Sequence, residues 1–396
     1  MFYYFEASMK RLNNMAYNLR PLKQMSHPTD LIKQFTPNWF TMNMGTGILS
    51  LMLAAFPYQV AGLHLLAKGL WIINIALFII FSILFIGRFV FYFKSAKKLL
   101  KHPVQSMFLG AIPMGLATII NGFLIFAGSQ MTPIALNLWW FDAFISIIVG
   151  LLVPFYMFTN QKHSIEDMTA IWLLPIVPAE VAAASAGFLA PHVAPAIGRY
   201  VIILGYALWA FSVPLAFGIL VILFLRLAWH KLPHRDMAVS TWLTLGPIGT
   251  GSLGLLLLGN DAPAVFTGTK LYIYAKTAYS VGPIGGLIMW GFGFWWLIIA
   301  ILMTFRYMQE DLPFNMGWWG FTFPLGVYTS ATITLFRLTG MELFQVIGAI
   351  FVIMLAFFWT VVTSKTLHGM WHGYLFKAPC LSIETGLPDK DMRCAD

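Results

Sequence analysis

The sequence predicts an all-α integral membrane protein whose ten transmembrane helices form five helical hairpins around a central axis. Three features predict this class: high hydrophobicity, long apolar runs, and a short motif that recurs in alternate runs. Of the 396 residues, 59% are hydrophobic and 10% are charged, and the mean hydropathy is +0.77. Soluble domains carry roughly 25% charged residues. Because an aqueous fold cannot bury this much apolar surface, the chain is expected to cross a bilayer several times.

Apolar runs between charged residues or Pro/Gly breaks define the ten candidate spans. In chain order they cover 38–56, 70–93, 106–127, 135–158, 168–190, 199–228, 237–258, 276–304, 318–336 and 343–364. Residues 38–365 therefore form the expected transmembrane domain. Because ten is an even number, both termini are expected on the same side of the membrane.

The basic residues indicate the orientation of these spans. Nineteen of the 24 Lys and Arg residues fall on the side of the termini, and the other five are Lys68, Arg199, Lys270, Lys276 and Arg337. Basic connections stay in the cytoplasm, so both termini are expected there, in a multi-pass protein of the cell membrane. The net charge of +9 is thus a topology signal, and a nucleic-acid partner is not expected.

The terminal segments are expected to lie in the cytoplasm. Residues 1–37 carry several charges before the first long apolar run, which excludes a cleavable signal peptide. Apolar residues at helical spacing there (Phe5, Met9, Leu12, Ala16, Leu19) indicate either an amphipathic helix on the membrane surface or a poorly ordered tail. Residues 366–396 form a short tail that holds both cysteines, Cys380 and Cys394. No disulfide framework, cysteine metal site or cofactor is expected.

A three-residue motif recurs in the odd-numbered spans at intervals of roughly 70 residues, as in a repeat of helical hairpins. It occurs as Asn43-Met44-Gly45, Pro113-Met114-Gly115, Pro178-Ala179-Glu180, Pro247-Ile248-Gly249 and Pro324-Leu325-Gly326. Proline removes a backbone donor, so each of these helices is expected to bend near mid-span. The glycine would remove side-chain bulk at the bend.

Such bends are tolerated in a bilayer only where protein or a wet cavity covers them. This favours odd-numbered helices inside, around a central pore, with even-numbered helices outside. Proline that serves helix packing alone is the alternative, and even-numbered spans also carry Pro154, Pro214 and Pro283.

Glu180 occupies the position that is glycine in the other four motifs. A carboxylate that faced lipid at mid-span would cost a few kcal/mol, so Glu180 is expected to face the axis or a neighbouring helix. In a dry site it could load and release a proton near neutral pH. The alternative is a protonated acid with a purely structural role, bonded to a neighbouring carbonyl.

Neutral hydrogen-bonding side chains on the odd-numbered spans suit an anion that must bind weakly and leave again. The candidates are Thr41, Asn43, Thr46, Thr118, Asn121, Ser185, Thr250, Ser252, Thr329 and Thr332, of which only some can face inward. Lys270, Lys276 and Arg337 are candidates for an outer vestibule that concentrates anions. Arg88 and Arg226 are expected to snorkel toward the inner surface.

Five stretches resemble the tellurite-resistance/dicarboxylate transporter family, which includes fungal malate permeases and sulfite efflux pumps and the plant slow-type guard-cell anion channel. They are FTPNWFTMNMGTGILSLMLAAFPY (35–58), HPVQSMFLGAIPMGLATII (102–120), WLLPIVPAEVAAASAG (172–187), LGPIGTGSLG (245–254) and WWGFTFPLG (318–326). The first is most similar to the malate and sulfite branch. The resemblance implies five hairpins around an anion-conducting axis, usually in a homotrimer with one pore per subunit.

The resemblance also implies a pore gate. A phenylalanine of the ninth helix plugs the pore in the channel members, and by similarity this is Phe323, with Phe321 as the second choice. Glu180 matches no residue assigned in those members, so a proton-coupled carrier is a further expectation.

The expected activity is transport of C4-dicarboxylates such as malate, coupled to protons through Glu180. The alternatives are a sulfite efflux pump, a gated small-anion channel and, remotely, a membrane-embedded enzyme. Substrate choice depends on the resemblance alone, and the lack of a bidentate clamp favours a small anion. An enzyme would need ionisable groups that converge, whereas Glu180, Asp142 and Asp261 are scattered. His368 and His372 lack a third ligand for a metal site.

Overall fold

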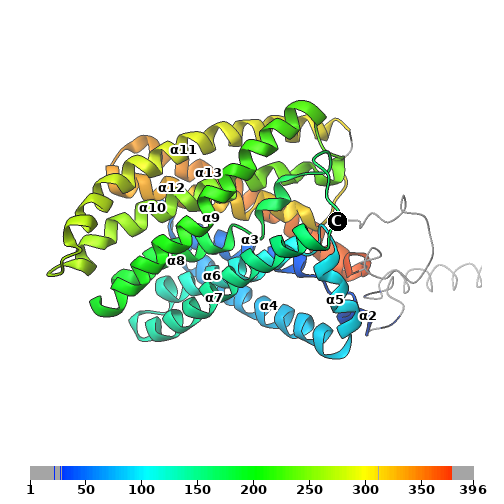
Figure 1. The fold of residues 1–396 in the computed structure, drawn as a ribbon, viewed down its shortest axis with the longest axis horizontal. Helices are drawn as coiled ribbons and strands as arrows, with labels where there is room; N and C mark the ends of the chain where they lie inside the picture. The colour runs from blue at the N-terminus through cyan, green and yellow to red at the C-terminus, as the bar shows by residue number, and fades with distance from the viewer. Residues whose placement is uncertain (1–21, 23–26, 28, 311, 377–396) are drawn as a thin grey trace, which may run out of the picture.

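A computed structural model describes residues 22, 27, 29–310 and 312–376 (Figure 1). In this part of the chain all regular secondary structure is helical, and there are no strands. The amphipathic segment expected near the N-terminus lies outside the described residues, as do both cysteines.

Ten long helices follow one another in the described part, and a short helix α2 (Asp30–Lys33) precedes them. They are α3 (Phe40–Ala54), α4 (Leu63–Phe91), α6 (Ala111–Phe126), α7 (Thr132–Thr159), α8 (Pro178–Leu189), α9 (Pro195–His230), α10 (Leu245–Phe266), α11 (Tyr272–Met308), α12 (Phe323–Thr339) and α13 (Glu342–His372). The short basic helix α5 (Phe93–Lys101) follows α4.

Seven helical segments of this part are long and apolar enough to cross a membrane. The other three long helices, α3, α8 and α12, have only 15, 12 and 17 residues. The all-helical membrane fold is therefore confirmed, while the count of ten spans stays a prediction.

The long helices form two concentric rings. In the inner ring α3 packs on α6, α6 on α8, α8 on α10, α10 on α12, and α12 back on α3. Each outer helix packs on two inner neighbours: α4 on α3 and α6, α7 on α6 and α8, α9 on α8 and α10, α11 on α10 and α12, and α13 on α12 and α3. The predicted five hairpins are confirmed, with the first, third, fifth, seventh and ninth of the ten long helices inside (α3, α6, α8, α10 and α12).

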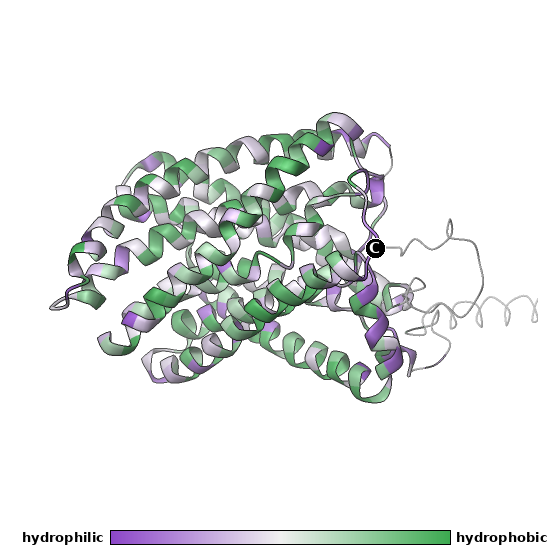
Figure 2. Cartoon of the chain, in the orientation of Figure 1, coloured by the Kyte–Doolittle hydropathy of each residue, from purple (hydrophilic) through white to green (hydrophobic). Residues whose placement is uncertain are grey.

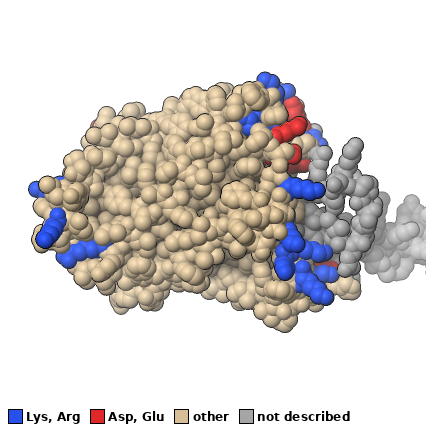
Figure 3. Space-filling view, in the orientation of Figure 1, with Lys and Arg blue, Asp and Glu red and all other residues tan. Residues whose placement is uncertain are grey.

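Burial follows the same division. In the spans that contain α6 and α10, 72% and 83% of the most apolar window is buried, against 22–33% in the outer helices. Exposed large apolar side chains cover the outer helices, which are largely hydrophobic in Figure 2. On the face that Figure 3 shows, charged residues are confined to the two ends. This is the surface that a bilayer requires.

The sequence had suggested that the motif prolines bend long helices near mid-span, but in the structure these prolines lie near the start of the inner α-helices. A 3₁₀ stretch precedes each inner helix: Pro37–Trp39, Met107–Gly110, Ala170–Leu173, Arg235–Thr244 and Met316–Phe321. Pro113, Pro178, Pro247 and Pro324 lie in the first turn of the α-helix that follows. The N–H groups of a first turn have no partner within the helix, so proline costs nothing there. The predicted bend is therefore a change of helix type.

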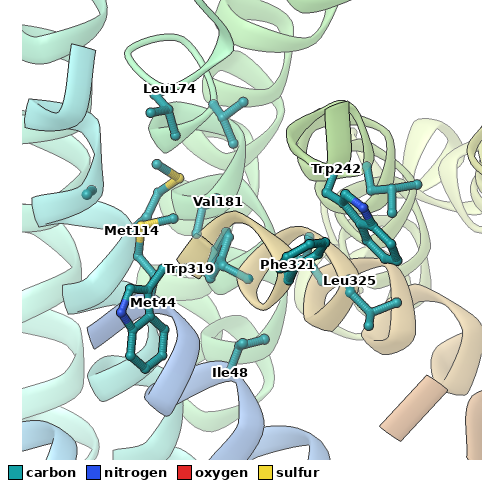
Figure 4. Close-up of a cluster of buried hydrophobic side chains, with 14 of the residues drawn as sticks. Met44, Ile48, Met114, Leu174, Val181, Trp242, Trp319, Phe321 and Leu325 are labelled. Carbon is teal, nitrogen blue, oxygen red and sulfur yellow. The ribbon is translucent and has the colours of Figure 1, made fainter. Parts of the chain in front are cut away.

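The motif glycines lie where inner helices touch. A Cβ atom on Gly249 would lie 2.7 Å from the backbone nitrogen of Tyr328, and one on Gly326 would collide with Ile48. Met44, Ile48, Met114, Val181 and Leu325 then join a single buried cluster from α3, α6, α8 and α12 (Figure 4). Glycine thus lets the backbones of neighbouring inner helices approach closely.

The connections between helices define two ends of the molecule. The basic end carries α5 and the connections at 160–169, 231–234 and 309–315, and the opposite end carries those at 55–62, 127–131, 190–194, 267–271 and 340–341. In Figure 1 α5 and α2 mark the basic end. Figure 3 shows Lys and Arg at both ends and acidic side chains at the basic end.

Candidate functional site

A cavity of about 250 Å³ lies within the inner ring, and we call it the axial cavity. All five inner helices line it: α3 with Ile48, Leu51, Met52 and Ala54 (and Ala55 just beyond), α6 with Ala117, Thr118, Asn121 and Ile125, α8 with Val181, Ala184 and Phe188, α10 with Thr250 and Leu253, and α12 with the residues of the next paragraph. No residue of an outer helix lines it. The motif repeat therefore encloses a shared central space.

One face of α12 forms a continuous wall of the axial cavity. Its residues are Phe323, Val327, Ser330, Ile333, Thr334 and Arg337. Apart from the adjacent pair Ile333 and Thr334, successive positions differ by three or four, as on one side of a helix. Among the described residues, Arg337 is the one ionisable residue that lines this cavity. The wall thus runs from an aromatic ring at one end to a guanidinium at the other.

The polar groups of the axial cavity differ in what they can still donate. The hydroxyls of Thr118 and Thr334 already donate to the carbonyls of Gly115 (2.7 Å) and Ser330 (2.8 Å). In the described part of the chain, the Ser330 hydroxyl and Arg337 bond no protein group, and the Asn121 Oδ1 atom is buried without a partner. The Ser330 hydroxyl, the Arg337 guanidinium and the Asn121 amide are therefore the groups that can form hydrogen bonds with a bound ion.

Glu180 is fully buried behind the wall of the axial cavity, at the junction of α8, α9 and α10. Its Oε1 atom lies 2.7 Å from the hydroxyl of Thr250, a residue that lines the cavity. Its Oε2 atom accepts no hydrogen bond, because the nearby Ser212 hydroxyl donates to the Ile176 carbonyl at 2.8 Å. Glu180 thus faces a neighbouring helix, one of the two expected orientations, and reaches the cavity through Thr250.

A second space, the narrow cavity, has a volume of about 30 Å³ and lies on the basic side of the first. Inner segments line it with Thr41, Met44, Leu174, Trp319 and other mostly apolar residues. Phe323 lines both the narrow and the axial cavity. Phe323 therefore lies where the two cavities meet, and it is the residue at which a gate is expected. A constriction with apolar walls excludes water readily.

A third space, the basic-end cavity, has a volume of about 540 Å³ and is lined by the connections that follow α5, α7 and α9. It shares Ile171, Asp236 and Met237 with the narrow cavity. Shared residues thus link the three cavities in a row, from the basic end through Phe323 to Arg337.

Two histidines of the basic-end cavity are held in the neutral form. Burial lowers the pKa of His102 to about 4, and its Nδ1 atom accepts hydrogen bonds from the backbone N–H groups of Val104 and Gln105 at 3.1 Å. Burial also lowers the pKa of His163, whose Nε2 lies 2.8 Å from the side-chain oxygen of Gln161. Neither ring supplies a fixed positive charge at neutral pH.

Several predicted pore residues instead tie helices together. Asn43 donates to Asn74 of α4 at 3.1 Å, and Asn74 donates to Thr118 at 3.0 Å. Thr46 accepts from Trp359 of α13 at 3.1 Å, and Ser252 donates to Gly286 of α11 at 2.8 Å. Thr329 donates to Leu325 within α12, Thr332 accepts from Trp290 of α11, and Ser185 is buried without a partner. Of the predicted set, Thr118, Asn121 and Thr250 line the axial cavity, and Thr41 lines the narrow one.

Among the other predicted residues, too, some line a cavity and others do not. Phe321, the second choice for the gate, lines neither cavity and stacks on Phe358 with ring centroids 4.8 Å apart. Of the three candidates for an outer vestibule, Arg337 lines the axial cavity, whereas Lys270 is exposed and Lys276 lies over the ring of Tyr272.

The expectation that Arg88 and Arg226 snorkel is wrong, because both are buried. Arg88 donates to the Phe35 carbonyl, and Arg226 donates to the carbonyls of Glu166 and Lys231. They tie the connections of the basic end to the outer helices instead of reaching for the membrane surface.

Sequence reasoning missed Ser330, Thr334 and Asp236. The spacing of Ser330 and Thr334 from Phe323 and Arg337 could have revealed the first two, whereas Asp236 carries no such signal. Within the described residues no three metal-ligating side chains converge, and His368 and His372 pack on each other with ring centroids 4.3 Å apart.

Residues 34–367 match the family described as voltage-dependent anion channel. The sulfite efflux pump of Arthroderma otae is 41% identical over 353 residues, which cover 87% of this chain and 93% of the pump. An uncharacterized transporter of Methanocaldococcus jannaschii is 31% identical, with 87% and 98% covered. The malic acid transport protein of Schizosaccharomyces pombe is 24% identical, with 84% and 77% covered.

Proposed function

Because the chain belongs to the voltage-dependent anion channel family, we propose that it carries sulfite out of the cell along the axis of its inner ring. Membership confirms the resemblance of the sequence, including the branch that holds sulfite efflux pumps and malate transporters. The family and these relatives are channels and transporters, so the chain is an anion transporter and not an enzyme.

The axial cavity supports a small inorganic anion as the substrate. It offers one guanidinium, Arg337, with an amide and a hydroxyl from Asn121 and Ser330. One cation and two neutral donors fit the charge of a compact anion, and such a set binds weakly enough to release it. A C4-dicarboxylate carries two separated carboxylates, and the second would find no cation in this cavity. We therefore place sulfite before malate, the reverse of the order that the sequence resemblance suggests.

The test is transport by the purified protein in liposomes. Radiolabelled sulfite and radiolabelled malate are offered separately, each with the other as an unlabelled competitor, with and without a pH gradient. We expect saturable sulfite flux that malate inhibits poorly. Saturable malate flux that sulfite cannot inhibit would overturn the substrate assignment, and absence of flux for both would overturn sulfite transport itself.

We further propose that Glu180 couples anion movement to a proton. The Thr250 hydroxyl lies 2.7 Å from both Glu180 Oε1 and the Gly246 carbonyl, yet it has one proton to donate. If Glu180 is protonated on Oε1, it donates to Thr250, and Thr250 donates to Gly246, so both short contacts of the Thr250 hydroxyl are hydrogen bonds. If Glu180 is ionised, its charge opposes an anion beside Thr250. Binding of the anion and of the proton would therefore favour each other.

Glu180→Gln tests this coupling, because glutamine keeps a donor for Thr250 but cannot release a proton. We expect sulfite flux down its own gradient to persist while stimulation by a pH gradient is lost. Glu166→Gln, at an exposed connection of the basic end, is the matched control and should keep the stimulation. Undiminished sulfite-driven proton flux in Glu180→Gln would remove Glu180 from the mechanism.

The arrangement in the membrane is part of the proposal. We propose ten spans in the cell membrane, with the basic end in the cytoplasm, because basic connections are retained there. A homotrimer with one pathway per subunit follows from the family resemblance alone.

A further inference from the structure

Asp236 stands at the junction of the basic-end cavity and the narrow cavity. It lines both, together with Ile171 and Met237. Within the described part of the chain, it is also the one ionisable residue that lines the narrow cavity. An ion that moves between the basic end and Phe323 therefore passes this carboxyl group, where the walls are otherwise neutral.

The backbone of Asp236 is fixed in place. Asp236 lies in the first turn of the 3₁₀ stretch Arg235–Thr244, and its carbonyl accepts a hydrogen bond from Asn315 at 2.9 Å. Its side chain is about one-third exposed, and its Oδ2 atom lies 3.0 Å from Nδ1 of His234. No Lys or Arg pairs with it among the described residues. The same Nδ1 atom accepts a hydrogen bond from the Asp236 backbone N–H at 3.4 Å, so His234 helps to hold Asp236 in place.

Other ionisable groups of the basic-end cavity come from the neighbouring connections and from α9. They are His102, Lys162, His163, Glu166, Asp167 and Arg226. Arg226 is occupied by backbone carbonyls, and the two histidines are held neutral by burial. The Asp167 carboxylate accepts a hydrogen bond from the Ser164 hydroxyl at 2.7 Å. Of the three cavities, Asp167 lines only the basic-end cavity. None of these groups lines the narrow cavity.

A negative charge at the mouth of an anion pathway needs an explanation. We propose that Asp236 is a specificity-determining residue, a fixed charge that admits singly charged anions in preference to doubly charged ones. The inference rests on the proposed transport of sulfite, which exists in singly and doubly charged forms. Coulomb repulsion grows in proportion to the charge of the anion, and a low-dielectric constriction strengthens it.

This mechanism predicts a fixed relation between two measured changes. Asp236→Asn removes the repulsion for both kinds of anion, and the energy removed is twice as large for a doubly charged one. If apparent affinity for a singly charged anion rises about threefold, that for a doubly charged anion should rise about tenfold, because doubling an energy squares the factor.

The experiment uses the full chain in liposomes, with nitrate and sulfate as inhibitors of sulfite flux from the basic end. Their charges stay fixed at −1 and −2 from pH 6 to pH 8. In wild-type protein we expect nitrate to inhibit better than sulfate. In Asp236→Asn the difference should shrink, with most of the gain in sulfate inhibition.

Three further variants make the result decisive. Asp236→Glu keeps the charge and should keep the preference for nitrate. Glu310→Gln removes an exposed acid of the basic end that lines none of the three cavities, and it should leave the preference unchanged. His234→Gln removes the imidazole beside Asp236 but leaves the carboxylate, and it should keep the preference for nitrate. Equal changes for nitrate and sulfate in Asp236→Asn, with sulfite flux intact, would overturn the inference; absence of wild-type sulfite flux would instead refute the proposed function.

Discussion

The phenyl ring of Phe323 lies where the axial cavity and the narrow cavity meet. Phe321, two residues earlier, packs between the aromatic side chains of Trp242 and Phe358. The two phenylalanines thus have the same chemistry and nearly the same sequence position, but only one can obstruct the pathway. This pair provides a matched test of the gate.

We expect Phe323→Ala to raise sulfite flux about tenfold, because it replaces the ring with an open, wettable passage; that factor corresponds to a barrier lower by about 1.4 kcal/mol. The measurement is the initial rate of sulfite flux in liposomes, normalised to protein content. Phe321→Ala should lower thermal stability through lost aromatic packing without raising the flux. If the flux rises for Phe321→Ala and not for Phe323→Ala, the gate is Phe321 and the assignment to Phe323 is wrong.

His102 makes folding sensitive to acid. Its folded pKa of about 4 lies below the ordinary value of 6.5, so the unfolded chain binds a proton that the folded chain refuses between these two pH values. Stability that is present above pH 6.5 is therefore lost as the pH falls to 4, by an amount on the order of 2 kcal/mol after allowance for partial solvation.

His102→Asn tests this effect because asparagine can keep an acceptor near the Nδ1 position but does not titrate. We expect the melting temperature in detergent to fall less between pH 7 and pH 4 than that of wild-type protein, with similar values at pH 7. An unchanged pH dependence would show that other groups control acid sensitivity.

At single-residue resolution the sequence predicted polarity better than orientation. Thr118, Asn121 and Thr250 line the axial cavity as expected, whereas Asn43 and Ser252 bond to outer helices. In a ring of helices every inner helix is buried on all sides, so the hydrophobic pattern does not mark the face that points to the axis. Partner helices decide that orientation, and one sequence does not reveal them.

At the scale of the helices, close contact between α10 and α12 depends on the glycine of the repeated motif. Gly249 and Gly246 lie one turn apart on α10, but a Cβ atom on Gly246 would meet nothing within 4 Å. Gly249→Ala should lower the free energy of unfolding by about 1–3 kcal/mol, because the new methyl group overlaps the backbone of Tyr328. Gly246→Ala should be neutral or stabilising by up to about 1 kcal/mol.

Thermal unfolding of both variants in the same detergent checks this difference. Equal melting temperatures for the two variants would mean that the inner helices can separate at no cost, and would remove the packing role of the motif.

The helices themselves were well predicted, because apolar runs and charged breaks mark them directly. The span expected at 135–158 is helix α7 (Thr132–Thr159), and that expected at 199–228 is α9 (Pro195–His230). The 3₁₀ stretches were not predicted, because proline removes an N–H group equally at a bend and in a first turn. Only the backbone of the preceding segment distinguishes these two cases.

At the scale of the whole molecule, the asymmetry of charge between the two ends controls how the chain enters the membrane. The basic end carries α5 with its four lysines, Lys94, Lys97, Lys98 and Lys101, whereas the opposite end carries isolated basic residues. Basic segments next to a span resist translocation, so the basic end is expected to stay in the cytoplasm. Sulfite that leaves the cell would then enter through the basic-end cavity and exit past Arg337.

Cysteine labelling in intact cells tests this orientation. Cys380 and Cys394 are first replaced by serine, and single cysteines are then introduced as Ser129→Cys at the opposite end or Ser164→Cys at the basic end, both at exposed positions. A membrane-impermeant thiol reagent should label the first variant in intact cells and the second only after permeabilisation. The reverse pattern would show that the basic end lies outside the cell. Asp236 would then face the outside, and its selection between singly and doubly charged anions would act on uptake instead of efflux.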